Sequence, residues 1–186
     1  RDHFQSGNEE NVRIIDEVTQ CLLNLSKRRV GALIVFERNT GLGDVIESGT
    51  VVDAEISDPL IENIFEPNTP LHDGAMIIRE ERIVAAACIL QLSDNYTISR
   101  ELGTRHRAAI GITESTDAVS LIVSEETGTI SVAVGGMLKR HLAPQTLERL
   151  LRNELTPVQN DQDANKLAKL KEKLLQTGKE ERRDEK

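Results

Sequence analysis

One short stretch of the chain combines residue types that do chemistry. His72, Asp73 and Gly74 stand together just before Met76–Ile78, a run typical of the start of a buried strand. Pro70 restricts the backbone ahead of them, and an Asp-Gly pair permits a sharp turn. We therefore expect His72 and Asp73 at the rim of a sheet, with room for a ligand against Gly74. An ordinary turn is the alternative that this stretch alone leaves open.

A second polar cluster lies downstream, at Gly103–Arg107. Arg105 and Arg107 fall in the first turn of a predicted helix, whose free N–H groups attract anions. Together with the hydroxyl of Thr104, two guanidinium groups there suit a phosphate. The alternative is a pair of arginines on surface carboxylates, each contact contributing about 0 to 1 kcal/mol. A Ser-Glu-Glu sequence at Ser124–Glu126, on the shoulder of a predicted hairpin, weighs against that alternative.

Composition limits what the chain can be. Its 186 residues suffice for one domain with a tail, and with 2% aromatic residues the core must be aliphatic. A net charge of -8 argues against a nucleic-acid partner, which needs a basic face, but it leaves room for a nucleotide site. Cys21 and Cys88 lie in apolar patterns, which indicates buried reduced thiols rather than a disulfide or a metal site.

The sequence contains neither a membrane helix nor a signal peptide. Its longest apolar run, Ile83–Leu90, is far shorter than the ~20 residues that a membrane helix needs. Because the chain begins at Arg1 rather than at a methionine, we expect it to be a fragment of a longer protein.

The predicted elements form an α/β domain, with a mixed parallel and antiparallel central sheet flanked by helices. After a lead-in over residues 1–7, apolar spacing predicts a helix over 8–28, ended by Gly31. Turn residues and apolar runs predict two hairpins. A pair of glycines, Gly135 and Gly136, is expected to break the last strand. The predicted strands are 32–36, 50–54, 75–79, 82–92, 119–124 and 129–134. Ser57 and Thr104 are each expected to cap a further helix, and a last helix is predicted over 143–154.

Two local patterns leave alternatives open. The glycine-containing segment 39–43 lacks the Lys-Ser/Thr ending of a P-loop, so a plain connection is favoured. The small residues 85–87 could leave space for a flat ligand on the sheet, although a closely packed helix is slightly favoured. After Pro157 the composition changes to charged residues. We therefore predict a domain over 1–156 and a mobile, solvated tail over 157–186.

As a set, these motifs resemble the diadenylate cyclase family. The resemblance rests on Pro-Leu-His-Asp-Gly-Ala at 70–75, Gly-Thr-Arg-His-Arg-Ala-Ala at 103–109 and Val-Ser-Glu-Glu-Thr-Gly at 123–128, and it covers roughly Asn11–Leu155. The short charged tail resembles the membrane-anchored type, since the DNA-scanning type carries long extra domains. The resemblance implies transmembrane helices upstream and a location at the cytoplasmic face of the cell membrane. This fragment itself is expected to make no membrane contact.

The resemblance implies a reaction in which two ATP molecules condense to cyclic di-AMP and two pyrophosphates. Such chemistry depends mostly on positioning and charge stabilisation, with Mn²⁺ or Mg²⁺ neutralising the triphosphate. Asp73 is expected to orient or deprotonate the 3′-hydroxyl, with orientation the more important because a free carboxylate is a weak base. His72 and Glu126 are the expected metal ligands, and an imidazole favours Mn²⁺.

The remaining site residues are expected to bind the nucleotide. Arg105 and Arg107 should hold phosphates and are counted with Asp73 as catalytic. Where relatives carry an aromatic residue beside the adenine, this chain has Ile89, which removes ring stacking and weakens the expected affinity for the base. The other expected substrate-binding residues are Gly74, Ala75, Leu90, Thr104, His106, Ser124 and Glu125.

One protomer that grips one ATP cannot present a second ATP in line to it with the same groups. We therefore expect a head-to-tail homodimer as the active species, with regulatory proteins as further partners. Two other functions compete with the cyclase. A non-catalytic nucleotide sensor would bind ATP without turnover, and a plain interaction domain would bind no nucleotide.

Overall fold

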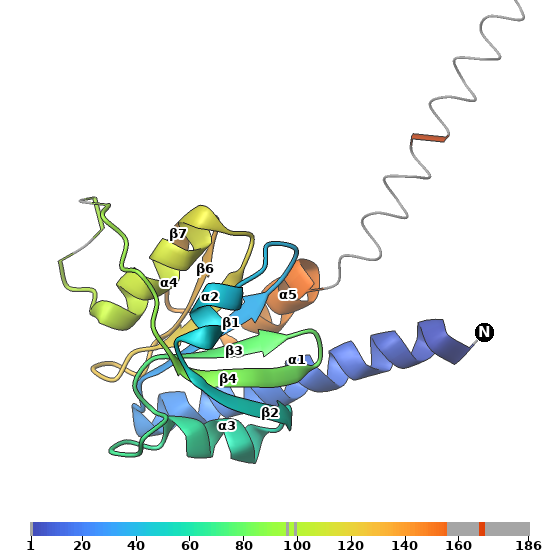
Figure 1. The fold of residues 1–186 in the computed structure, drawn as a ribbon, viewed down its shortest axis with the longest axis horizontal. Coiled ribbons are helices and arrows are strands. Elements are labelled where there is room, and N and C mark those ends of the chain that lie inside the picture. The colour runs from blue at the N-terminus through green and yellow to red at the C-terminus, as the bar shows by residue number, and fades with distance from the viewer. Residues whose placement is uncertain (1, 96, 99, 156–167, 170–186) are drawn as a thin grey trace, which may run out of the picture. The chain divides into compact units, whose positions relative to one another are not determined.

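The structure is a computed structural model that describes residues 2–95, 97–98, 100–155 and 168–169 (Figure 1). The chain divides into two compact units, residues 1–151 and 152–186. Most of the tail predicted over 157–186 lies outside the described residues. Its two described residues, 168–169, are helical.

The first unit is built on a seven-stranded sheet in the order β2-β4-β3-β1-β5-β6-β7. β1 pairs with β3 in parallel, and all other neighbouring strands are antiparallel. The predicted mixed sheet, with its parallel pair at the first strand, is thus confirmed. The strands are β1 (Ala32–Glu37), β2 (Thr50–Glu55), β3 (Ala75–Arg79), β4 (Arg82–Cys88), β5 (Val119–Val123), β6 (Ile130–Val134) and β7 (Met137–Lys139).

Helices cover both faces of this sheet (Figure 1). On one face, Leu33 and Val35 of β1 join a buried cluster that includes Ala108 and Ile112 of helix α4. Ile34, which lies between them, is fully buried toward the opposite face, where α1 and α3 pack. The helices are α1 (Asp2–Arg28), α2 (Gly43–Glu47), α3 (Asp58–Phe65), α4 (Thr104–Ser115) and α5 (Pro144–Leu155). No described helix is long and apolar enough to cross a membrane.

The first helix differs from its prediction at both ends. It begins at Asp2, so the expected lead-in over 1–7 is wrong, because polar helix formers such as Glu9 extend a helix without a buried face. At its other end, Arg29 has a φ of 52°, and the Val30 N–H donates to the carbonyl of Leu25 at 3.0 Å. The left-handed residue that ends α1 is therefore Arg29 rather than Gly31.

Turn chemistry explains three further outcomes. The predicted cap of α3 is confirmed, since the Ser57 hydroxyl accepts from the N–H of Leu60 at 3.3 Å. Gly135 and Gly136 were expected only to break a strand, but with φ of 59° and 78° they form a tight turn into β7. The expected cap at Thr104 is wrong, because the N-cap of α4 is Gly103, which has no side chain to offer, and Thr104 is the first helical residue.

The patterns left open by the sequence are now settled. Residues 39–43 run into α2, which contacts β4, and Val45 and Ile46 of α2 pack against the buried cluster that includes Ala85. The closely packed helix, the favoured alternative, is therefore the one observed. Cys21 and Cys88 are both free and buried, as predicted.

Candidate active site

Three segments with polar residues meet at one end of the sheet. Because β1 and β3 start where β4 and β5 finish, Ala32 pairs with Val123 and Ala75 pairs with Cys88. The His-Asp-Gly stretch precedes β3, and the Ser-Glu-Glu stretch follows β5. The first turn of α4 lies above this end of the sheet (Figure 1).

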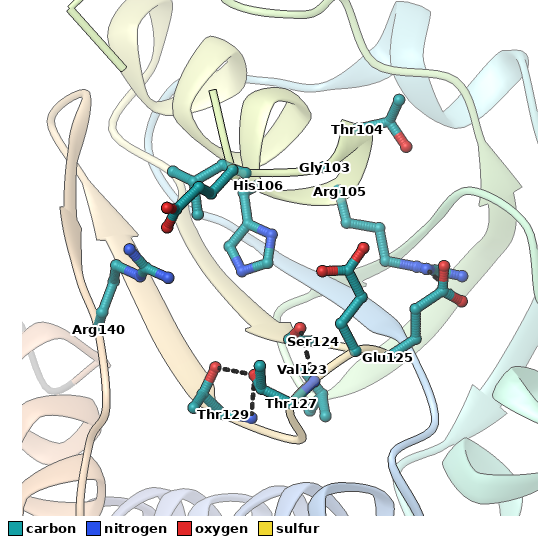
Figure 2. Close-up of a pocket in the computed structure, with 13 residues that line it drawn as sticks. Gly103, Thr104, Arg105, His106, Val123, Ser124, Glu125, Thr127, Thr129 and Arg140 are labelled. Carbon is teal, nitrogen blue, oxygen red and sulfur yellow. Dashed lines mark hydrogen bonds and ion pairs between the residues drawn. The ribbon is translucent and has the colours of Figure 1, made fainter. Parts of the chain in front are cut away.

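Two cavities lie at this end and share Thr104 and Arg105 in their walls. We call them the base cavity and the phosphate cavity, after the parts of a nucleotide that the sequence analysis led us to expect there. The base cavity, about 230 Å³, is lined by Leu33, Asp73, Gly74, Ala75, Cys88, Ile89, Leu90, Leu92, Thr104, Arg105 and Ala108. The phosphate cavity, about 150 Å³, is lined by Glu101, Leu102, Gly103, Thr104, Arg105, His106, Val123, Ser124, Glu125, Glu126, Thr127, Thr129 and Arg140 (Figure 2).

The structure therefore brings Asp73 and Arg105 together in the base cavity. Asp73 is exposed, so its carboxylate is accessible to a ligand. Gly74 has a φ of 118°, and a Cβ there would lie 2.8 Å from the carbonyl carbon of Ala87. Gly74 is thus required by a left-handed backbone and by the close approach of β4, in addition to its place in the cavity wall.

Arg105 lines both cavities. Its Nη1 lies 3.4 Å from a carboxylate oxygen of Glu125, a side chain that is mostly exposed. The Nε atom of Arg105 is buried and has no hydrogen-bond partner among the described residues. A guanidinium with an unsatisfied donor and one long ion pair retains the capacity to bind an anion.

Arg107 is placed differently from Arg105. Residues two positions apart do not share a helix face, and Arg107 lines neither cavity. The described contacts of Arg107 come from its backbone, whose carbonyl accepts from the N–H of Ser93 at 3.1 Å and whose N–H donates to Gly103. Its expected role in holding phosphate remains a prediction.

The β5–β6 turn forms one wall of the phosphate cavity (Figure 2). The Ser124 hydroxyl accepts from the N–H of Thr127 at 3.3 Å, and the hydroxyls of Thr127 and Thr129 lie 2.8 Å apart. This turn is held from below by α1, because the Ser26 hydroxyl donates to the carbonyl of Gly128. The turn therefore presents a cluster of hydroxyl groups on a supported backbone.

His106 of α4 and Arg140, which follows β7, both line this cavity (Figure 2). His106 is buried, and burial lowers the pKa of its imidazole below the usual value of 6.5, with the charges of Arg140 and Arg105 adding to this effect. A neutral imidazole is consequently favoured near pH 7. Arg140 is exposed and brings a second guanidinium to the cavity.

The two expected metal ligands, His72 and Glu126, do not line the same cavity. The Nδ1–H of His72 donates to the carbonyl of Thr69 at 2.6 Å, which leaves Nε2 as the available ligand atom. His72 lines neither cavity, whereas Glu126 lines the phosphate cavity. Among the described residues, no group of three or more His, Cys, Asp or Glu side chains could hold a metal ion. Any bound cation would need further ligands from substrate or water.

Sequence reasoning found the motif residues and missed others. The cavities contain the expected Ala75, Leu90, Thr104, His106 and Ser124. They also contain Thr127 and Thr129, which the hairpin position could have revealed, and Arg140, for which no local signal existed. Ile89 is 75% exposed at the rim of the base cavity, as befits a residue proposed to border a ligand.

Comparison with known proteins agrees with this arrangement. The family model described as "DisA bacterial checkpoint controller nucleotide-binding", or DAC, matches residues 19–138, more than half of the chain. The chain belongs to this family. The resemblance noted in the sequence is therefore confirmed for the DAC domain.

Individual relatives support the same assignment. The cyclic di-AMP synthase CdaA of Bacillus subtilis is 49% identical over 158 residues, 85% of this chain and 58% of the relative. A crystal structure of a double mutant of DacA from Staphylococcus aureus is 51% identical, with a TM-score of 0.76, over 77% of this chain and 96% of that one. A hypothetical membrane spanning protein from Bacillus cereus is 48% identical, with a TM-score of 0.67, over 69% and 63% of the two chains. This chain thus spans little more than half of CdaA.

Proposed function

We propose that this DAC domain is a diadenylate cyclase, which condenses two ATP molecules into cyclic di-AMP and two pyrophosphates. The observation that carries the proposal is the meeting of Asp73 and Arg105 in one cavity, from motifs in separate parts of the chain. The name of the synthase from Bacillus subtilis, at 49% identity, supports the same reaction. The domain over 1–156 is the part we expect to be catalytic, with the charged segment 157–186 as an appendage.

The two cavities suit the two ends of a nucleotide. The base cavity has apolar walls from Leu33, Ala75 and Leu90, which suit a flat base, with Ile89 giving apolar contact without ring stacking. The phosphate cavity offers hydroxyls and the guanidinium groups of Arg105 and Arg140, which suit a triphosphate. Thr104 and Arg105, in both walls, would lie near the α-phosphate that joins the two parts.

In each transfer, O3′ of one ATP forms a bond to the α-phosphorus of the other. The bond from that phosphorus to the α,β-bridging oxygen breaks, and pyrophosphate leaves. Asp73 would orient the attacking hydroxyl and accept its proton as the new bond forms, while Arg105 would stabilise charge on the α-phosphate. Arg107 is kept as a further phosphate contact, and Glu125, in the wall of the phosphate cavity, is kept as a further nucleotide contact.

A divalent cation fits the donors present, with His72 and Glu126 as the proposed holders. Nε2 of His72 is left available by the Nδ1 hydrogen bond, and Glu126 presents a carboxylate at the phosphate cavity. Because these two side chains do not line a common cavity, each would need phosphate oxygens as additional ligands of the cation. Bound Mn²⁺ or Mg²⁺ supplies charge neutralisation of the triphosphate and of the departing pyrophosphate.

Two nucleotides must face each other, so we propose a head-to-tail homodimer in which each protomer supplies one ATP. The longer protein is proposed to sit at the cytoplasmic face of the cell membrane, in keeping with the name of the relative from Bacillus cereus. Regulatory proteins remain further expected partners.

Incubation of the purified chain with ATP and Mn²⁺, followed by mass spectrometry, tests the activity. Cyclic di-AMP and pyrophosphate are the expected products. Binding of ATP without product would instead favour a nucleotide sensor. Absence of ATP binding by calorimetry would favour an interaction domain.

A further inference from the structure

Gly31, at the entrance of β1, has no backbone reason to be glycine. The helix before it is already ended by Arg29, whose φ is 52°. Gly31 itself is absent from the residues with positive φ, so an alanine could adopt the same backbone conformation. Another feature must explain the lack of a side chain at this position.

That feature is the guanidinium of Arg105. A Cβ built on Gly31 would lie 2.4 Å from Nη1, 2.6 Å from Cζ and 3.1 Å from Nη2 of Arg105. These are its three nearest neighbours, and all belong to one side chain. The guanidinium therefore packs directly on the backbone of Gly31, in space that any other residue would fill.

Within the described part of the chain, the polar contacts of this guanidinium are weak. Its ion pair to Glu125 is 3.4 Å long, and the Glu125 side chain is 67% exposed. A pair of this kind contributes little and holds its partners loosely. The buried Nε has no hydrogen-bond partner among the described residues. Packing against Gly31 is thus a main restraint on the position of Arg105 in the walls of the two cavities.

We propose that Gly31 is a positioning residue for the cyclase reaction, because it seats the guanidinium of Arg105 at the boundary between base and phosphate. This inference rests on the proposed function. Since the obstacle to a Cβ is the far end of a flexible side chain, Gly31→Ala should displace Arg105 rather than unfold the sheet. A displacement of about 1 Å at a reacting phosphate can reduce turnover by about 100-fold.

The test is a double-mutant cycle with Gly31→Ala, Arg105→Ala and the combined variant. Gly41→Ala is the matched control, because no described atom lies within 4 Å of a Cβ at Gly41 and its φ is not positive. We expect Gly31→Ala to lower kcat about 10- to 100-fold. In the Arg105→Ala background it should have no further effect, because the group that it displaces is gone. Gly41→Ala should match the wild type in both backgrounds.

Two results would overturn the inference. One is a wild-type kcat in Gly31→Ala. The other is a loss of kcat from Gly31→Ala that is equally large in the wild-type and the Arg105→Ala backgrounds. Thermal melting keeps the test decisive if Gly31→Ala is destabilised. The inference requires that adding Arg105→Ala to Gly31→Ala restores the melting temperature. If the combined variant melts as low as Gly31→Ala alone, the inference is contradicted. Affinity for a non-hydrolysable ATP analogue, measured on the same variants, separates this inference from the proposed function. If the wild type binds the analogue but forms no cyclic di-AMP, the proposed function is refuted. The double-mutant cycle, measured on the affinity for the analogue, would still test the contact between Gly31 and Arg105.

Discussion

Asp73, just ahead of β3, and Arg105, in the first turn of α4, line the same cavity. One offers an exposed carboxylate and the other a guanidinium with an unpartnered buried Nε. A site that must hold a hydroxyl nucleophile beside a phosphate needs both kinds of group. This relationship gives rise to most of the predictions below.

Asp73→Asn should keep ATP binding and lose most turnover. The amide preserves size but cannot accept the hydroxyl proton, and the loss of such a group costs about 100- to 10,000-fold in rate. Product formation measured by mass spectrometry, alongside calorimetric ATP affinity, checks this. Asp44→Asn is the control, since Asp44 is exposed in α2 and lines neither cavity. Undiminished turnover in Asp73→Asn would remove this carboxylate from the mechanism.

Arg105→Ala should weaken ATP binding more than Arg107→Ala does. Arg105 lines both cavities, and loss of a charge-assisted contact costs about 1.5 to 3 kcal/mol. Arg107 lines neither, so within one protomer a smaller loss is expected for it. Titration calorimetry with a non-hydrolysable analogue measures both. Equal losses in the two variants would mean that Arg107 also binds the triphosphate, and no loss in either would favour the surface-arginine alternative.

Arg140→Ala should raise the KM for ATP and, separately, raise the pKa of His106. Burial is the main cause of the low His106 pKa, and the charge of Arg140 is the next. Removing that charge makes protonation easier. Titration of the His106 ring signals by NMR gives a readout that does not depend on catalysis. Arg149→Ala, on α5 and outside both cavities, is the control, and a pKa that does not move would place Arg140 away from His106 in solution.

Asp58→Asn should stabilise the domain at neutral pH. Burial, with the neighbouring Glu62 carboxyl adding to it, raises the pKa of Asp58 from 3.8 to about 6. Because the folded state binds this proton more tightly than the unfolded state, stability falls as pH rises through this range and stays lower above it. After allowance for partial exposure, we expect a gain of about 1 kcal/mol at pH 7.5 that disappears near pH 4. Urea unfolding at both pH values measures it, and an equal gain at both would contradict the explanation.

The dimer proposal has a direct test by dilution. Turnover per protomer should fall as the protein is diluted, because each ATP needs a partner held by a second copy. Sedimentation measured over the same concentrations shows whether association falls in parallel. Constant specific activity from a monodisperse monomer would rule the dimer mechanism out.

Much of the fold was predictable because local signals were strong. Continuous apolar runs marked β1 and β5, and the segment Glu125–Gly128 marked the turn between β5 and β6. The missed elements were short: α2 buries none of its five residues, and β7 has three. Elements of that size carry too few residues to establish a period.

The residues of the site also divide into those that the sequence could predict and those that it could not. Asp73 and Arg105 were predictable because their residue types and neighbours form recognisable motifs. Arg140 and Gly31 were not, since each acquires its role only when distant segments meet at one end of the sheet. For Arg107, adjacency in a motif predicted a task shared with Arg105. That task stays a prediction, because the two side chains lie on different faces of the helix and Arg107 lines neither cavity.

The hydrogen bond between Ser26 and Gly128 joins the longest helix to the turn that carries Ser124 and Thr127. Gly128 has a φ of 74°, and a Cβ there would come within 2.5 Å of the Ser26 carbonyl, so the two segments are in close register. A displacement of α1 along its axis would therefore move the hydroxyl-bearing wall of the phosphate cavity. The position of the longest helix and the shape of that cavity are thus coupled through this contact.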